Sequence, residues 1–135
     1  MRVVVDTNVV VSGLLTPGGV CRQVLDAASG GLARACVDER ILLEYETVLQ
    51  RPQFEIAPND VAAALNVMRS VAERVAARPL RVNLPHTSDL PFLEVAHASD
   101  AILVTGNLRH FPKRSRAGVT VLGPREFLEL LATSP

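Results

Sequence analysis

Three valines, Val3 to Val5, form the first apolar run of this chain, and the run ends abruptly on Asp6. Short β-branched runs of this kind are typical of strands that are buried on both faces at the centre of a parallel sheet. In open α/β sheets, ligands bind at the carboxyl ends of such strands. Asp6 is therefore a candidate for chemistry, although Asp6 or Thr7 could instead serve only as the cap of the apolar segment over residues 9–15.

Downstream, strand-like and helix-like segments alternate. We predict strands over residues 32–37, 80–84, 101–104 and 119–122, and helices over residues 20–28, 39–50, 58–77, 88–99 and 124–132. Apolar residues at helical spacing, prolines near helix starts and glycines near helix ends support these boundaries. The alternation predicts an α/β fold with a mostly parallel sheet that is covered by helices on both faces.

Composition restricts the class of protein. The 135 residues are 48% hydrophobic, which indicates one globular domain over residues 1–135. No apolar stretch is long enough to cross a membrane and no basic leader precedes an apolar run, so we expect a cytoplasmic protein without membrane contact. The formal net charge is zero, so any contact with nucleic acid must use a local patch. Cys21 and Cys36 match neither a disulfide framework nor a zinc pattern, and we expect both to pack as small hydrophobic residues.

Glu44 stands out on its predicted helix because it shares a face with apolar residues. Ile41, Tyr45 and Val48 lie at helical spacing around it, so its side chain is expected to point towards the body of the protein. A carboxylate among apolar neighbours needs a partner, a metal ion or a shifted pKa. The alternative is a glutamate that is paired with an arginine at the rim of the core.

Asp89 occupies a comparable position at the start of the helix predicted over residues 88–99. Its neighbours on the same helical face are Phe92, Leu93 and Ala96, so Asp89 is expected to point inward. A capping role is the alternative, because a negative charge at a helix N-terminus complements the helix dipole. Glu94 falls on another face, and we expect it to be exposed or to lie behind the site.

Asn107 follows a second buried strand, in the segment Thr105-Gly106-Asn107. The glycine allows a sharp turn, so the polar groups at the end of this strand are expected to face the same crevice as Asp6. Gly-Asn is also common in plain turns, and that alternative stays open.

One concentrated basic patch follows at once, within residues 109–116. It contains four arginine or lysine side chains and one histidine: Arg109, His110, Lys113, Arg114 and Arg116. Its position beside the predicted site makes the patch a candidate for contacts with nucleic-acid phosphates. The alternative is a solvated loop, which is the usual role of a charged run.

Taken together, these segments resemble a PIN domain. The resemblance rests on Asp6-Thr7-Asn8, Leu43-Glu44-Tyr45, the segment 89–96 and the segment 104–111, and it extends along nearly the whole chain. It is closest to the branch of VapC-like ribonucleases, the toxins of toxin–antitoxin systems. The resemblance implies a three-layer α/β/α fold whose first strand is central and adjacent to the fourth. It also implies a divalent-metal-dependent endoribonuclease that is dimeric and is neutralised by a cognate antitoxin.

The resemblance also implies roles for individual residues. By position, Asp6, Glu44 and Asp89 match the acids that bind the metal, and Asn107 stands where many relatives have aspartate. Some members of the branch share the asparagine, so we keep all four as candidate catalytic residues. We assign a supporting role behind these acids to Thr7, Asn8, Ser12 and Thr105.

The chemistry of such a site can be argued without the family. Carboxylate oxygens suit Mg²⁺ or Mn²⁺, and three carboxylates without a cation would repel one another. A bound metal would relieve that repulsion, bridge to an RNA phosphate and activate a water molecule for in-line attack. No serine–histidine pair or reactive cysteine indicates covalent catalysis. His110 could protonate the leaving oxygen, but a structural or phosphate-contacting role is the preferred interpretation.

Two other classes of function compete with this hypothesis. One is a PIN-like module that binds RNA or a protein with little or no cleavage, and Asn107 favours it. The other is a phospho-accepting signalling domain, which also places an acid after its first strand. We disfavour the signalling domain because Asp6 has no acidic neighbour and because the only lysine, Lys113, lies in the basic patch.

Overall fold

The computed structural model describes residues 1–134 and contains a five-stranded, all-parallel sheet. The strands are β1 (Arg2–Val5), β2 (Arg34–Val37), β3 (Glu73–Arg74), β4 (Ile102–Val104) and β5 (Val121–Leu122), in the order β3-β2-β1-β4-β5. The prediction of an α/β fold with a central first strand is therefore confirmed. Because β1 pairs with β4 from Val3 to Val5, the residues that follow these two strands emerge side by side at one edge.

Six α-helices accompany the sheet in the described chain. They are α1 (Thr7–Leu15), α2 (Val20–Ser29), α3 (Glu39–Leu49), α4 (Pro58–Val71), α5 (Leu90–Ser99) and α6 (Pro124–Thr133). Short 3₁₀ turns complete the chain: η1 (Pro52–Phe54), η2 (Thr87–Asp89), η3 (Leu108–His110) and η4 (Lys113–Ser115). None of the helices within residues 1–134 is long and apolar enough to span a membrane.

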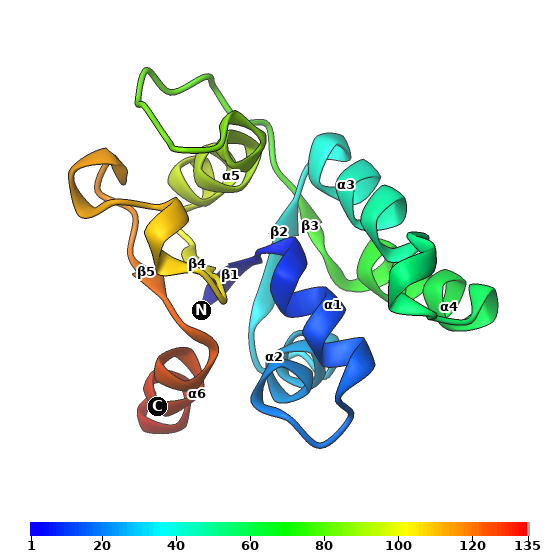
Figure 1. The fold of residues 1–135 in the computed structure, drawn as a ribbon. Coiled ribbons are helices and arrows are strands. Elements are labelled where there is room, and N and C mark those ends of the chain that lie inside the picture. The colour runs from blue at the N-terminus through cyan, green and yellow to red at the C-terminus, as the bar shows by residue number, and fades with distance from the viewer. Residues whose placement is uncertain (135) are drawn as a thin grey trace.

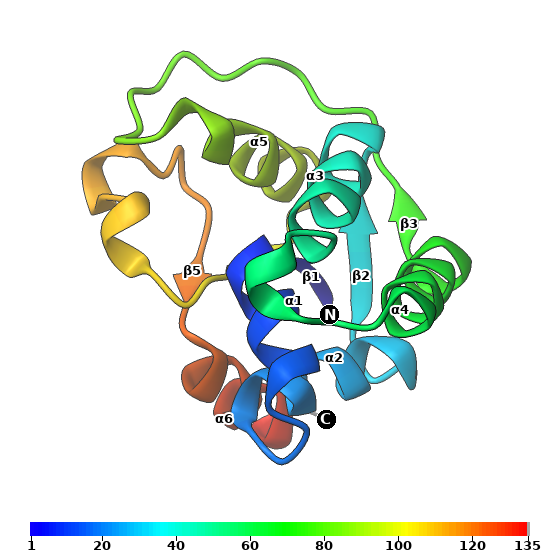
Figure 2. The same cartoon turned by 45° about the vertical axis from the view of Figure 1, so that its right-hand side comes forward.

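The helices lie on both faces of the sheet. Figures 1 and 2 show α5 on the opposite side of the sheet from α1 and α2. Right-handed crossovers require this arrangement, since the chain moves one way along the sheet from β1 to β2 and the other way from β3 to β4. The β1 residues Val3, Val4 and Val5 are at most 1% exposed, as a strand covered on both faces should be.

The structure differs from the predicted secondary structure between residues 58 and 84. The helix predicted over residues 58–77 ends at Val71, because Ala72 adopts an extended backbone and the next two residues pair with β2 as β3. The strand predicted over residues 80–84 does not form. Residues 75–86, which we call the strap, instead run without regular structure past α5 to η2 (Figure 2). The helix predicted over residues 88–99 is divided into η2 and α5.

Candidate active site

Asp6 lies where β1 ends, and its carboxylate is held by several donors. Oδ1 accepts a hydrogen bond from the backbone N–H of Thr7 at 2.8 Å, so Asp6 does cap α1. Oδ2 accepts hydrogen bonds from the Thr105 hydroxyl at 2.8 Å and from Asn8 Nδ2 at 3.3 Å. Burial raises the pKa of Asp6, the Thr105 hydrogen bond opposes this, and the charge of Asp89 adds to it. Capping therefore accounts for one oxygen and leaves the second oriented by side chains from both strand ends.

Glu44 approaches the same strand end from α3. Its carboxylate accepts a hydrogen bond from the Thr7 hydroxyl, and within residues 1–134 it makes no ion pair. Burial raises the pKa of Glu44, the Thr7 hydrogen bond lowers it, and the nearby charge of Asp6 raises it further. The structure thus brings Glu44 and Asp6 together through Thr7, which contacts both carboxylates.

Tyr45 anchors α3 in this position, which the sequence pattern did not reveal. Its hydroxyl donates a hydrogen bond to the backbone carbonyl of Val5, the residue that precedes Asp6. Its ring lies 6.3 Å from that of Phe92 on α5. Helical periodicity places Tyr45 only on an apolar face, because periodicity indicates that a residue is buried but not which backbone group it reaches.

Asp89 ends η2 and precedes α5, but its side chain makes no capping hydrogen bond. The side chain is 11% exposed, and Oδ2 lies 3.0 Å from His110 Nδ1. Apart from this contact, no hydrogen-bond partner of Oδ2 is found within residues 1–134. Burial raises the pKa of Asp89, His110 opposes the shift, and the charge of Glu44 adds to it. A buried carboxylate oxygen without a donor is costly, and a cation would relieve that cost.

The turn after β4 packs against the segment after β1. The backbone N–H of Asn107 donates to Thr105 Oγ1 at 3.0 Å, and the backbone N–H of Gly106 donates to Asn8 Oδ1 at 3.0 Å. A Cβ atom at residue 106 would lie 3.3 Å from Asn8 Oδ1, so glycine permits this close approach. Asn107 is half-buried, and no hydrogen bond of its side chain is seen in the described chain.

Only some of the other predicted residues lie at the site. Thr7, Asn8 and Thr105 contact the acids of the site. Ser12 does not: it is exposed on α1, and its hydroxyl is a hydrogen-bond neighbour of the Cys21 thiol, whose pKa it lowers against the larger effect of burial. Cys21 is half-buried and Cys36 buried, and both thiols are free. In the basic patch, three side chains are exposed: Arg109, Lys113 and Arg114. The fourth cation of the patch, Arg116, is half-buried and donates from Nε to the carbonyl of Phe111 at 2.8 Å.

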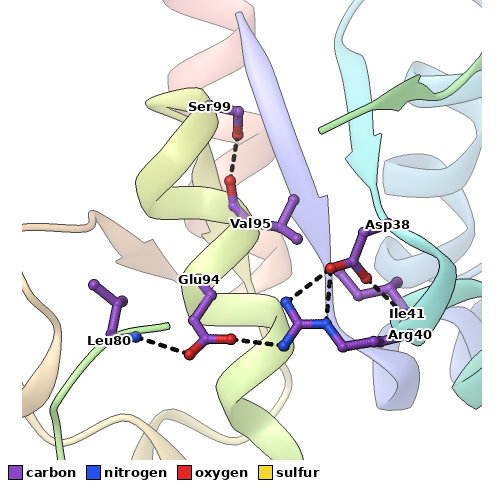
Figure 3. Close-up of polar contacts among 7 residues, drawn as sticks. All are labelled: Asp38, Arg40, Ile41, Leu80, Glu94, Val95 and Ser99. Atoms are coloured by element: carbon purple, nitrogen blue, oxygen red, sulfur yellow. Dashed lines mark hydrogen bonds and ion pairs between the residues drawn. The ribbon is translucent and has the colours of Figure 1, made fainter. Parts of the chain in front are cut away.

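Glu94 is not exposed, contrary to one of the two positions expected for it. Its side chain is 6% exposed, and its oxygens accept hydrogen bonds from Arg40 Nη1 at 2.7 Å and from the backbone N–H of Leu80 at 2.9 Å (Figure 3). Arg40 also pairs with Asp38, the residue that caps α3 by accepting a hydrogen bond from Ile41. Glu94 therefore joins α5 to the strap and to the start of α3, and α3 carries Glu44.

Three carboxylates from distant parts of the chain thus act on one another. Asp89 raises the pKa of Asp6, Asp6 raises that of Glu44, and Glu44 raises that of Asp89, in each case in addition to the larger effect of burial. As they stand, no three His, Cys, Asp or Glu side chains within residues 1–134 form a group that could hold a metal ion. The donor chemistry still fits Mg²⁺ or Mn²⁺, because these ions take oxygen ligands and Mg²⁺ commonly uses one or two carboxylates together with water.

Comparisons with known proteins agree with this geometry. A family model described as the PIN domain matches residues 2–109. VapBC2 from Rickettsia felis, solved with a DNA fragment from its promoter, matches with a TM-score of 0.64 at 18% identity, over 91% of this chain and 98% of that chain. PAE2754 from Pyrobaculum aerophilum matches with a TM-score of 0.63 at 17% identity, over 99% and 91% of the two chains.

A third solved structure belongs to a protein of unknown function. It is a domain from Methanocaldococcus jannaschii, which matches with a TM-score of 0.54 at 21% identity, over 89% of this chain and 88% of that chain. A search of curated proteins finds no match. At these identities the structural matches concern the fold alone.

Proposed function

The chain belongs to the PIN-domain family, and from that premise we propose that it is a divalent-metal-dependent endoribonuclease of toxin–antitoxin type. The observation that carries this proposal is the gathering of three carboxylates where β1 and β4 end: Thr7 contacts both Asp6 and Glu44, Thr105 binds Asp6, and the charge of buried Asp89 acts on Asp6. Carboxylates gathered in this way repel one another, and a bound cation relieves that repulsion.

Asp6, Glu44 and Asp89 would hold Mg²⁺ or Mn²⁺, and the side-chain oxygen of Asn107 is available as a neutral fourth donor. When bound, such an ion supplies charge neutralisation at an RNA phosphate and an activated water molecule for hydrolysis. The buried Oδ2 of Asp89 supports this assignment, because apart from its contact with His110 no hydrogen-bond donor to it is found within residues 1–134.

The remaining residues of the site orient these groups. Thr105 and Asn8 direct Oδ2 of Asp6, and Thr7 directs the carboxylate of Glu44. Fixed donors of this kind keep carboxylates aligned before a ligand arrives, which reduces the reorganisation that binding requires. His110 contacts Asp89, and we assign it to orienting this acid or to contacting the phosphate of the substrate.

The basic patch is the part of the molecule that we assign to the RNA substrate. Arg109, Lys113 and Arg114 are exposed beside His110, and we assign them to phosphate contacts with RNA. The solved relative VapBC2 carries the name of a toxin–antitoxin pair, and by that analogy we include a cognate antitoxin and a homodimer. Co-purification with a small protein that abolishes cleavage would test the antitoxin.

A module that binds RNA or protein without cleaving RNA remains the second candidate. Two observations favour it: Asn107 brings no charge, and the acids of the described chain do not converge into a group that could hold a metal as they stand. A binding module would retain the acids without needing the metal.

The test is a metal titration followed by a cleavage assay. We expect the wild-type protein to bind Mg²⁺ or Mn²⁺ in calorimetry and to cleave RNA only in its presence. Asp6→Asn and Glu44→Gln should abolish cleavage without unfolding the protein. Glu46→Gln is the matched control, because Glu46 lies on the same helix and pairs with Arg69 instead. Full activity of either site variant at saturating Mg²⁺ would remove the catalytic assignment, and metal binding without cleavage would favour the binding module.

A further inference from the structure

The site is poor in exposed aromatic rings that could contact a nucleobase. The chain has one tyrosine, four phenylalanines and no tryptophan. Four of these five rings are at most 1% exposed: Tyr45, Phe92, Phe111 and Phe127. The fifth, Phe54, is half-buried in η1, beyond the C-terminal end of α3. A base that arrives at the acids therefore finds no exposed phenylalanine or tyrosine within residues 1–134.

His86 provides a planar ring at this position. It is exposed, it ends the strap, and its backbone carbonyl accepts a hydrogen bond from the N–H of Asp89 at 3.1 Å. The centroid of its ring lies 4.4 Å from that of His110, with 46° between the two planes. His110 in turn lies 3.0 Å from Asp89. His86 is thus fixed to the site twice, through the backbone of Asp89 and through the ring of His110.

The strap that carries His86 is itself anchored. The N–H of Leu80 donates a hydrogen bond to Glu94 at 2.9 Å (Figure 3). Leu84, further along the strap, is 9% exposed. A ring at the end of an anchored segment loses less conformational freedom when a ligand binds than a ring on a free loop does. His86 is therefore suited to act as a binding surface.

We propose that the ring of His86 is the stacking platform for one nucleobase of single-stranded RNA, next to the phosphate that a metal ion bound by Asp6, Glu44 and Asp89 would hold. The proposal rests on the proposed function and deepens it. Bases in single strands are free to stack on aromatic side chains, whereas bases in a duplex are already stacked and paired. Because every base has a π-face, such a platform selects an unpaired nucleotide without demanding a particular base.

The experiment measures RNA binding by fluorescence anisotropy, with Ca²⁺ in place of Mg²⁺ so that binding is observed apart from cleavage. The probes are an end-labelled single-stranded RNA of mixed sequence and a set of the same RNA with one abasic nucleotide at each position in turn. The variants are His86→Ala, His86→Phe, which keeps a planar ring, and His97→Ala. His97 is the matched control, because it is an exposed histidine in the last turn of α5.

For the intact RNA, we expect His86→Ala to weaken binding by about 5- to 30-fold, the range of one base stacked on a partly exposed ring. His86→Phe should bind within about twofold of the wild type, because it retains the stacking surface. His97→Ala should bind as the wild type does. One abasic position should weaken wild-type binding by a similar factor and have no effect on binding by His86→Ala.

The abasic RNAs distinguish a base that stacks on His86 from an indirect role in which His86 only supports the ring of His110. If His86→Ala weakens binding by the same factor at every abasic position, His86 contacts no base and the proposal is wrong. If wild-type protein cleaves RNA with Mg²⁺ but His86→Ala binds RNA normally, the platform is refuted and the proposed function stands. If the abasic coupling is present but no cleavage occurs with Mg²⁺ or Mn²⁺, the platform stands and the nuclease assignment is wrong. Absence of RNA binding by the wild type would overturn both.

Discussion

Replacement of Glu94 by glutamine tests how the helices of the site are held together. Both partners of Glu94 are hydrogen-bond donors: Arg40 Nη1 and the backbone N–H of Leu80. A carboxylate offers an acceptor to each of them, whereas an amide offers one acceptor and one NH₂ group. In Glu94→Gln, one of the two contacts must therefore become a donor facing a donor, whichever way the amide is turned.

The magnitude follows from burial. A buried donor left without an acceptor costs about 1–3 kcal/mol. The lost ion pair adds less, about 0.5 kcal/mol, because the Arg40 side chain is 48% exposed and its charge is screened by water. We expect Glu94→Gln to lower the free energy of unfolding by about 1.5–3.5 kcal/mol and Tm by about 6–14 °C, since a chain of this length loses about 4 °C per kcal/mol.

Urea unfolding followed by circular dichroism measures the free energy, and amide hydrogen exchange reports on Leu80 directly. Lost protection of the Leu80 amide in Glu94→Gln would show that the new NH₂ group faces Leu80, and kept protection that it faces Arg40. Glu46→Gln is the control, because it removes an ion pair to Arg69 in which both side chains are more than 40% exposed, and it should cost less than about 0.5 kcal/mol. Equal stabilities of the two variants, with Leu80 protection unchanged, would refute the argument that Glu94 satisfies two donors.

The remaining predictions concern the site itself. In EDTA, the folded protein should lose stability as pH rises from 4.5, the ordinary pKa of glutamate, through the raised pKa of Glu44, because the folded state holds that proton more strongly than the unfolded chain does. Glu44→Gln should reduce this loss and melt higher than the wild type at neutral pH, as measured by thermal unfolding, and a lower Tm would contradict it. Asn107→Asp should lower the Mg²⁺ concentration for half-maximal cleavage severalfold, because it adds a charge that attracts the ion, and superimposable titrations would place Asn107 outside the metal's reach. Joint replacement of Lys113 and Arg114 by alanine should reduce the salt slope of RNA binding by about 1.4, or about 0.7 for each lost phosphate contact with a single strand. An unchanged slope in anisotropy titrations would show that the patch is only a solvated loop.

Much of the fold could be predicted because it is encoded over short distances along the chain. β1 is a run of valines, Asp6 caps α1, and Asp38 caps α3 through the N–H of Ile41. Each of these features involves residues that are at most three positions apart, so the sequence pattern contains both partners. The inward faces of α3 and α5 follow from helical periodicity for the same reason.

β3 and the strap were predicted wrongly because their structure depends on a distant partner. Val71, Ala72 and Val75 continue the helical spacing of α4, but residues 73 and 74 pair with Cys36 and Val37 instead. A strand of two residues has almost no local pattern of its own, so pairing across the sheet outweighs the helical propensity of the segment. In the strand predicted over residues 80–84, the N–H of Leu80 is instead bound by Glu94, and no strand of the described sheet pairs with this segment.

The sequence by itself determined which residues carry charge at the ends of β1 and β4 and which helical faces are apolar. Only the tertiary structure decided which of these groups meet: Thr7 with Glu44, Asp89 with His110, and His86 with His110. It also decided that Glu94, on a face of α5 that periodicity leaves open, is covered by the strap and by Arg40. The physical reason is that a local pattern specifies the direction of a side chain within its own element, whereas burial and pKa depend on charges and surfaces that arrive from elsewhere in the chain.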